Sequence, residues 1–420
     1  MIVNLILLLI SLLIYSGYGI AGLAYLIGAV VISWGAGLLT PRWRWAAIIS
    51  VALNAVSLLM LKLQPLTGIP WLSVLGVSYF TLQIMAYQID VFRGKCPPER
   101  NFIRYALYVT WIPHMFMGPI ERYDSMLPRL TEKRMICWDG ISRGALRILL
   151  GAVKKLIIAA RLNVIISAIS ADTASYNGAY ALAAMLLYSV QLYCDFSGGI
   201  DMVLGASQVV GIPLSENFDR PYFSQSIKEF WRRWHITLGA WLRDYVYIPL
   251  GGSRKGTWRK LLNTVVTFLV SGLWHGVQYL LWGFLNGIFV CVGERLKTRS
   301  KTLNRIGTFL VVSFLWAFFV WPDTVTALNM LLSVFTVPNY AAFVSGIGTL
   351  GLTVGDWIVL AAAMLLLWAY DLWAARIALW IKRCGPAARL GLICAVGLLV
   401  LVFGMYGIGF NVDSFIYGGF

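Results

Sequence analysis

The sequence contains few charged residues. Asp, Glu, Lys and Arg make up 12% of the 420 residues, whereas hydrophobic residues make up 59%. Charged residues are typically about 25% of a water-soluble domain, so this composition excludes that class. The apolar runs have helical lengths and do not alternate in ~10-residue segments. We therefore predict an all-α, polytopic bundle of transmembrane helices and not an outer-membrane barrel.

Several signatures of other protein classes are also missing. The six cysteines are scattered without metal-ligand spacing, so neither a disulfide framework nor a metal site is predicted. No Gly-x-Ser-x-Gly elbow or Cys–His pair indicates a covalent nucleophile. The net charge of +16 does not indicate nucleic acid, because the basic residues cluster between apolar runs. That distribution is typical of a protein whose partner is the lipid membrane.

The distribution of basic residues predicts the topology. Lys and Arg are absent from 162–218 and between the cluster at 295–305 and Arg376. Because Lys and Arg concentrate on the cytoplasmic side, each gap predicts an outward and an inward crossing. We expect a cytoplasmic N-terminus, retained N-terminal helices in place of a cleaved signal peptide, and a re-entrant or interfacial element at 102–120. The whole chain, 1–420, is expected to form one membrane domain. The nine expected spans are 2–16, 19–39, 45–63, 71–91, 148–168, 179–208, 306–322, 353–370 and 390–409.

A basic, tryptophan-rich stretch covers residues 219–260, with nine Lys or Arg against three Asp or Glu. Within it, Trp231, His235 and Leu238 follow the spacing of one helical face. We expect a continuous helix on the cytoplasmic membrane surface, with His235 facing the bundle, that ends at the turn 249–252. On spacing alone, a histidine packed in the core is the favoured alternative to a functional one at this position.

The segment 261–293 has 33 residues and no formal charge, yet basic residues flank both of its ends. A straight helix of that length would be roughly 50 Å long, well beyond a ~30 Å hydrocarbon core. Two short arms that meet near 272–276 satisfy both constraints. This turn would hold Trp274 and His275 deep in the membrane, where an ionisable residue indicates a functional site.

Two aspartates, Asp195 and Asp201, fall within an expected span. A carboxylate at membrane depth costs at least ~2.5 kcal/mol, so each is expected to face protein or a water-filled cavity. A structural role in holding helices together and a functional role remain equally open. For His114, within WIPHMFMGPI, a structural or interfacial role is favoured.

Histidine chemistry narrows the possible reactions. A neutral imidazole, with an ordinary pKa of about 6.5, can take a proton from a hydroxyl at physiological pH. With neither a covalent nucleophile nor a metal cluster predicted, direct acyl transfer fits the sequence. In such a reaction, a histidine activates an alcohol that attacks an activated acyl carbonyl.

Two adjacent motifs carry a family resemblance. EFWRRWHITLGAWLRDYVYIPLGG at 229–252, followed by GLWHG at 272–276, resembles the membrane-bound O-acyltransferase (MBOAT) superfamily, and specifically its bacterial cell-envelope branch. That branch includes the membrane subunit for alginate O-acetylation and the D-alanyl transferase of teichoic acid modification. Further segments that resemble family patterns are GVSYFTLQIMAYQIDVFRGK at 76–95, MGPIERY at 117–123, YCDFSGGIDM at 193–202, LSENFDRPYFSQSI at 214–227 and FIY near the C-terminus.

The resemblance implies a ring of helices around a central tunnel, with a catalytic core at approximately 179–293. It places His275 at the narrowest point as the general base, and His235 as the second motif histidine, which positions or polarises the acyl donor. Further candidates for donor contact, or for orienting the two motifs, are Arg233, Trp274 and Asp244.

The resemblance also implies the reaction partners. The acyl donor, acetyl-coenzyme A or an acyl-carrier thioester, is expected from the cytosol, and the acceptor from outside; no permanently bound cofactor is expected. The basic stretch 219–260 suits phosphates or an acidic carrier protein. We predict a bacterial cytoplasmic-membrane O-acetyltransferase that acts on an exported polysaccharide or envelope glycan, with an extracytoplasmic acyltransferase-like or esterase-like partner.

Three alternatives remain, one of which is a non-catalytic scaffold. The first is D-alanyl transfer from a carrier protein towards teichoic acid, which uses the same machinery with a different donor. The second is a proton-coupled transporter in which Asp195, Asp201 and His275 relay protons. A transporter predicts symmetrical halves or an inverted repeat, and the sequence shows neither.

Overall fold

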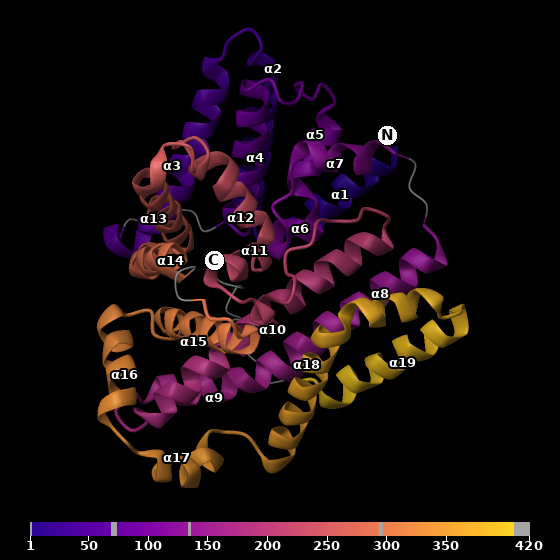
Figure 1. Cartoon of the computed structure of the whole chain (residues 1–420). Coiled ribbons are helices and arrows are strands. Elements are labelled where there is room, and N and C mark those ends of the chain that lie inside the picture. The colour runs from indigo at the N-terminus through magenta and orange to yellow at the C-terminus, as the bar shows by residue number, and fades with distance from the viewer. Residues whose placement is uncertain (1, 69–73, 133–135, 294–296, 407–420) are drawn as a thin grey trace.

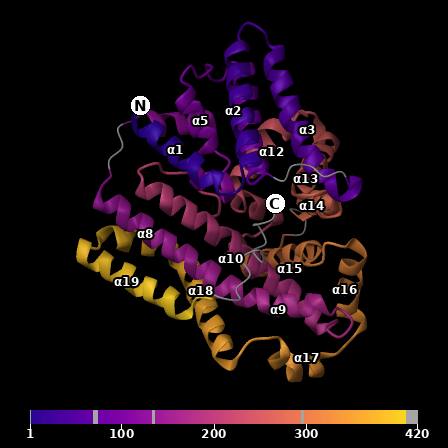
Figure 2. The ribbon, with the colours of Figure 1, turned by 180° about the vertical axis from the view of Figure 1, so that it is seen from behind.

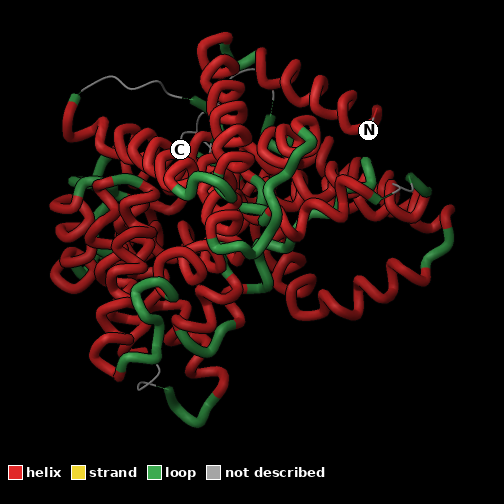
Figure 3. The backbone as a smooth tube through the Cα atoms, turned by 90° about the horizontal axis from the view of Figure 1, so that it is seen from above, coloured by secondary structure: helices red, strands yellow, loops and turns green. Residues whose placement is uncertain are grey.

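The computed structural model describes residues 2–68, 74–132, 136–293 and 297–406. Within these ranges every regular element is a helix, and the one strand-like pairing is an isolated antiparallel bridge between Phe218 and Trp234. The predicted all-α fold is confirmed. Figure 1 shows the N-terminal helices in the upper part of the molecule and the C-terminal helices in the lower part. Figure 3 shows that mostly short loops join them.

The first seven helices lie together at one end of the molecule, as Figures 1 and 2 show. The four predicted N-terminal spans appear as helices, although the start of the fourth lies outside the described residues. The re-entrant element predicted at 102–120 is the pair α5 and α6, which are 9 and 6 residues long and too short to cross. The helix breaks at Trp111 because Pro113 has no N–H to continue the ladder. The bounds are α1 Ile2–Ser16, α2 Ile20–Leu39, α3 Trp45–Thr67, α4 Val77–Phe92, α5 Phe102–Thr110, α6 Ile112–Met117 and α7 Tyr123–Thr131.

A long helical run and α10 cross the middle of the molecule side by side. The run is longer than the span predicted at 148–168 and contains a π-helical turn. Its parts, with α10, are α8 Trp138–Ala152, η1 Val153–Ala159, α9 Ala160–Ala171 and α10 Ala179–Val209.

The carboxylates of α10 are paired with cations of this run. Lys155 contacts Asp195, while Lys154 Nζ lies 2.8 Å and Arg147 Nη2 3.0 Å from the Asp201 carboxylate. Removing one member of such a pair would leave a buried charge uncompensated. Of the two roles left open for these aspartates, the geometry supports the structural one, and it weakens the case for a proton relay.

The segment around the two sequence motifs folds into short helices followed by a hairpin. The helix predicted to run through His235 is not continuous: it breaks there into α11 and α12, so that prediction was wrong. The turn predicted at 249–252 is present after η3. The bounds are α11 Ile227–Arg233, α12 Ile236–Leu242, the π-helical η3 Arg243–Tyr247, α13 Gly256–His275, η4 Val277–Tyr279 and α14 Leu280–Gly293.

The C-terminal part contains more helix than predicted. The stretch expected to be an external connection is helical, with α16 bent by 109° from the segment that follows it. The helix α18 extends well past the predicted span 353–370 and is kinked at Trp373, whose φ and ψ are non-helical. The bounds are α15 Lys301–Val320, α16 Thr324–Thr336, α17 Tyr340–Gly346, η6 Ile347–Thr349, α18 Val354–Arg383 and α19 Pro386–Phe403.

Six of the described helices are long and apolar enough to cross a membrane, or seven if the bent pair 324–336 and 340–349 is one span. These are α2, α3, α10, α15, α18 and α19. The chain is therefore a multi-pass membrane protein. The count of nine, which also includes α1, α4 and the α8–α9 run, stays a prediction, as does the single-domain organisation.

The hairpin of α13 and α14 depends on glycine. Gly276 ends α13 with φ +148°, a value that residues with a Cβ rarely adopt. The predicted bend near 272–276 is confirmed, but the first arm is 20 residues long and not short. The two arms approach so closely that a Cβ on Gly283 would lie 2.4 Å from the Phe268 carbonyl oxygen.

This contact generates a stability prediction. Replacing Gly283 by Val forces the arms apart, and overpacking of this kind costs about 1–3 kcal/mol. We expect Gly283→Val to lower the thermal unfolding temperature of the detergent-solubilised protein. The control is Gly307→Val on α15, where a Cβ would meet nothing within 4 Å. Equal unfolding temperatures for the two variants would contradict the close packing of the hairpin.

Candidate active site

Backbone pairing brings two separate motifs together. The Asp219 N–H donates to the Arg233 carbonyl at 2.9 Å, and the Ile236 N–H donates to the Asn217 carbonyl at 3.0 Å. Between these bonds lies the bridge that joins Phe218 to Trp234. The strand-like pairing interrupts the helix at His235, because the Ile236 amide now bonds outside its own helix.

His235 adopts a left-handed backbone conformation, with φ +44°. For a residue with a side chain this costs about 1–2 kcal/mol, so the surrounding contacts must hold it in place. The residue is buried, and the edge of its ring packs on Phe196 with a centroid separation of 4.9 Å. The helix break between α11 and α12 thus determines the direction of the His235 imidazole. In a continuous helix the imidazole would point elsewhere.

Asn217 fixes the tautomer of His235. Its Oδ1 accepts the Thr237 N–H at 3.0 Å and lies 3.3 Å from His235 Nδ1. A backbone N–H can only donate, so this side-chain atom is the oxygen, and Nδ1 must carry the proton that it accepts. In the neutral ring, Nε2 is then left as the acceptor. Asn217 lies within one of the motifs, but its role could not be predicted, since nothing in the spacing shows which side chain lies beside which histidine.

Aromatic rings enclose His275. It is the last residue of α13, and ring centroids lie 4.7 Å away for Trp274, 5.5 Å for Trp282 and 5.6 Å for Phe319. All three meet the imidazole edge-on, at interplanar angles of 79–86°. The ring is therefore held in one orientation by packing.

Both histidines line a single cavity of about 420 Å³. Its inner wall is largely apolar and includes Trp231, Trp234 and Phe268. Three exposed cations also line it: Lys228, Arg232 and Arg243. The hydrogen bond to the Asp244 carboxylate, 2.8 Å long, raises the pKa of Arg243, which therefore stays charged. The cavity combines two histidines, an apolar interior and a basic mouth.

The other three predicted site residues lie beside this cavity and not on its wall. Arg233 forms an ion pair of 2.7 Å with Glu229, one turn earlier on α11. The Trp274 indole donates to the Ser78 carbonyl at 3.3 Å, which turns it towards α4. Asp244 pairs with Arg243 and, at 3.4 Å, with Arg122. Roles for these three residues in donor contact stay predictions. Asp244 joins Arg243 of η3 to Arg122, which precedes α7.

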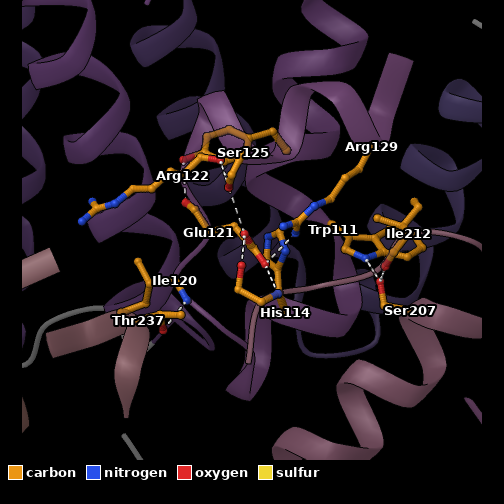
Figure 4. Close-up of polar contacts among 12 residues, drawn as sticks. Trp111, His114, Ile120, Glu121, Arg122, Ser125, Arg129, Ser207, Ile212 and Thr237 are labelled. Carbon is orange, nitrogen blue, oxygen red and sulfur yellow. Dashed lines mark hydrogen bonds and ion pairs between the residues drawn. The ribbon is translucent and has the colours of Figure 1, made fainter. Parts of the chain in front are cut away.

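Figure 4 shows a buried acidic hub, which consists of Glu121 and the side chains that bond to it. Glu121 accepts from Arg129 at 3.0 Å, and from both the backbone and the hydroxyl of Ser215, at 2.5 and 3.0 Å. Beside it, the Ile120 N–H donates to the Thr237 hydroxyl at 3.0 Å, which donates in turn to Asn217. The segment 117–123 therefore holds the residues that orient His235.

His114 lies in the same region but not on the wall of the cavity. It is fully buried, and its Nε2 lies 3.1 Å from the Gln83 side-chain nitrogen. This placement agrees with the favoured structural role.

Comparison with known proteins identifies the family. The sequence model of the MBOAT, membrane-bound O-acyltransferase family, matches residues 99–337, more than half of the chain. The chain belongs to this family. The match includes both histidine motifs, the acidic hub and the hairpin. The MBOAT membership that the two motifs indicated is thus confirmed.

The related MBOAT-family proteins include three named types. A probable alginate O-acetylase of Pseudomonas fluorescens is 37% identical over 335 residues, which cover 75% of this chain and 67% of that protein. A peptidoglycan O-acetyltransferase of Helicobacter pylori is 33% identical over 61% of this chain and 56% of its own length. A teichoic acid D-alanyltransferase of Bacillus subtilis is 29% identical over 57% of this chain and 65% of its own length. Across the alginate proteins, the matched region spans about half to two thirds of the relative.

The role of Asn217 in this MBOAT site is testable. Asn217→Ala removes the acceptor that orients His235, and misplacement of this kind typically costs about 10²-fold in rate. We expect acyl transfer by membranes that contain the variant to fall by that order. The control is Asn304→Ala, since the hydrogen bonds of the Asn304 side chain among the described residues are to Thr298, an exposed neighbour far from His235 in sequence. An undiminished rate in correctly folded Asn217→Ala would exclude the orienting role.

Proposed function

We propose that the protein is a membrane O-acyltransferase that moves an acetyl group from an activated cytoplasmic donor to hydroxyls of an exported polysaccharide or another cell-envelope glycan. The proposal rests on one observation: His235 and His275 line the same cavity, and the exposed cations Lys228, Arg232 and Arg243 form its basic mouth. The names of the alginate and peptidoglycan relatives support acetyl transfer to a glycan. A bacterial cytoplasmic membrane is the location that fits such an acceptor.

In the proposed reaction, His275 is the general base. Its neutral imidazole takes the proton of the acceptor hydroxyl as the oxygen attacks the thioester carbonyl. The new C–O bond forms, the C–S bond breaks, and the departing thiolate takes up the proton. The aromatic rings around His275 restrict the imidazole to one orientation, which reduces the entropy lost on reaching the reactive geometry.

His235 has a narrower role in this scheme than the sequence suggested. Asn217 keeps the proton on Nδ1, so Nε2 is an acceptor when the ring is neutral. An acceptor cannot donate a hydrogen bond to a thioester carbonyl, but it can accept one from an amide N–H of a pantetheine arm. We therefore assign His235 to positioning the donor and not to polarising its carbonyl.

The cavity mouth suits a phosphorylated donor. Lys228, Arg232 and Arg243 can contact the phosphates of coenzyme A, or acidic groups of a carrier protein. Acetyl-coenzyme A is the proposed donor. D-alanyl transfer from a carrier protein is the second candidate, favoured by the relatives named teichoic acid D-alanyltransferases. An extracytoplasmic acyltransferase-like or esterase-like protein is the proposed partner that completes delivery to the glycan.

The general-base assignment predicts a large loss in one variant. His275→Ala removes the proton acceptor, and general-base catalysis is worth about 10²–10⁴-fold. We expect membranes containing His275→Ala to transfer label from acetyl-coenzyme A more slowly by that factor. His114→Gln is the matched control, because glutamine can still bond to Gln83. Full transfer by a folded His275→Ala protein would refute the mechanism.

The same assay separates the two donors. Membranes are given labelled acetyl-coenzyme A in one arm and a labelled D-alanyl carrier protein in the other. Transfer from acetyl-coenzyme A alone is the expected result. Transfer from the carrier alone would show that the transferred group is D-alanyl and not acetyl. The proposed role of His275 as general base would still hold.

The basic mouth predicts a separate kinetic effect. Arg232→Gln removes a charge-assisted contact with the donor, worth about 1.5–3 kcal/mol, so the KM for donor should rise by roughly tenfold or more while kcat changes little. The matched control is Arg254→Gln, a basic residue of the same segment that does not line the cavity. An unchanged KM in Arg232→Gln would place the donor phosphates elsewhere.

A further inference from the structure

Two further cavities lie away from the histidines, where α18 packs on the α8–η1 run; α10 and the segment 216–220 also line the first, and α19 also lines the second. The first has a volume of about 410 Å³ and is strongly charged. The second, of about 630 Å³, is lined almost entirely by apolar side chains of η1, α18 and α19. Neither cavity shares a lining residue with the histidine cavity.

The two cavities adjoin each other. Four residues line both of them, namely Leu150, Lys154, Tyr370 and Ile377. The junction lies beside the kink of α18 at Trp373, which lines the apolar cavity. Both α18 and α19 pack on the α8–η1 run and hardly on each other. The apolar cavity therefore lies between α18 and α19, and the charged cavity adjoins it; together they form one candidate space, charged at one end and apolar at the other.

The charged end has cations that its own carboxylates do not neutralise. Arg147 and Lys154 are paired with Asp201, and Arg220 with Asp219. Lys382 has no carboxylate partner among the described residues, and Arg143 shares the Asp139 carboxylate, which lies outside the lining, with Arg389 of α19. The lining contains five cations, Arg143, Arg147, Lys154, Arg220 and Lys382, against four carboxylates, Asp201, Glu216, Asp219 and Asp371.

The order of the two ends along α18 matches one membrane leaflet. Lys382 is in the basic last turn of the helix, on the side of the basic loops, and the apolar lining extends back to Ile358. From Tyr370 to Ile358 the helix rises about 18 Å, close to the ~15 Å of hydrocarbon in one leaflet. The charged end thus lies at headgroup level and the apolar end at the depth of acyl chains.

From this geometry we propose that the space binds a glycerophospholipid, with its phosphate at Lys382 and Arg143 and an acyl chain between α18 and α19. With Asp139 and its second partner Arg389 included, cations still exceed carboxylates by one, which matches the single negative charge of a phosphodiester. The apolar compartment distinguishes a lipid from free phosphate or a soluble nucleotide. The lipid would supply the packing that the two helices do not give each other.

The test uses the full-length protein, delipidated in detergent. Its unfolding temperature is measured with phosphatidylglycerol, with diacylglycerol, which lacks the phosphate, and with glycerol phosphate, which lacks the chains. We expect phosphatidylglycerol to stabilise the protein and the other two to have little effect. Equal stabilisation by diacylglycerol, or stabilisation by glycerol phosphate, would overturn the proposal.

Two variants test whether the lipid binds in these two cavities. Lys382→Glu reverses the headgroup charge, and Ala362→Trp fills the apolar compartment that Ala362 lines. Each is expected to weaken binding of phosphatidylglycerol at least about tenfold, as measured by native mass spectrometry. The matched controls are Arg383→Glu and Ala361→Trp, neighbours that line neither cavity. Undiminished lipid binding in both Lys382→Glu and Ala362→Trp, or displacement of the lipid by acetyl-coenzyme A, would disprove this site.

Discussion

The site depends on the short backbone pairing between the segments 217–219 and 233–236. Without the two hydrogen bonds there, the helix that begins at Ile227 would continue through His235 and direct its imidazole elsewhere. The same pairing brings the Asn217 side chain to the histidine ring and to Thr237. A few main-chain bonds thus set the position, orientation and tautomer of one histidine.

The second histidine is fixed by different means. The Gly276 turn and the close approach at Gly283 hold His275 at the end of a rigid hairpin, and aromatic rings surround it. Packing is a suitable constraint for a buried ring, because an apolar interior offers few polar partners. Hydrogen bonding orients one histidine of the cavity, and ring packing orients the other.

Much of this arrangement could be predicted from the sequence. The uncharged run 261–293 between basic flanks required a bend, and the glycines located it, because length and charge are properties of the chain itself. The break at His235 could not be predicted, since residues 229–242 have good helical spacing and the competing hydrogen bonds come from residues 14–20 positions earlier. The ion-pair partners of Asp195 and Asp201 could not be predicted either, because the register between two helices decides which lysine pairs with which carboxylate.

The left-handed backbone at His235 also restricts which side chains this position accepts. Asparagine, aspartate and glycine enter that conformation readily, whereas β-branched residues are strongly disfavoured. An exchange to asparagine would keep the chain path and a polar side chain while removing the imidazole. An exchange to valine would disturb the helix break and the contacts of Asn217 that depend on it. The imidazole and the backbone conformation of residue 235 can therefore be changed separately. The effect of losing the imidazole can be measured while the cavity keeps its structure.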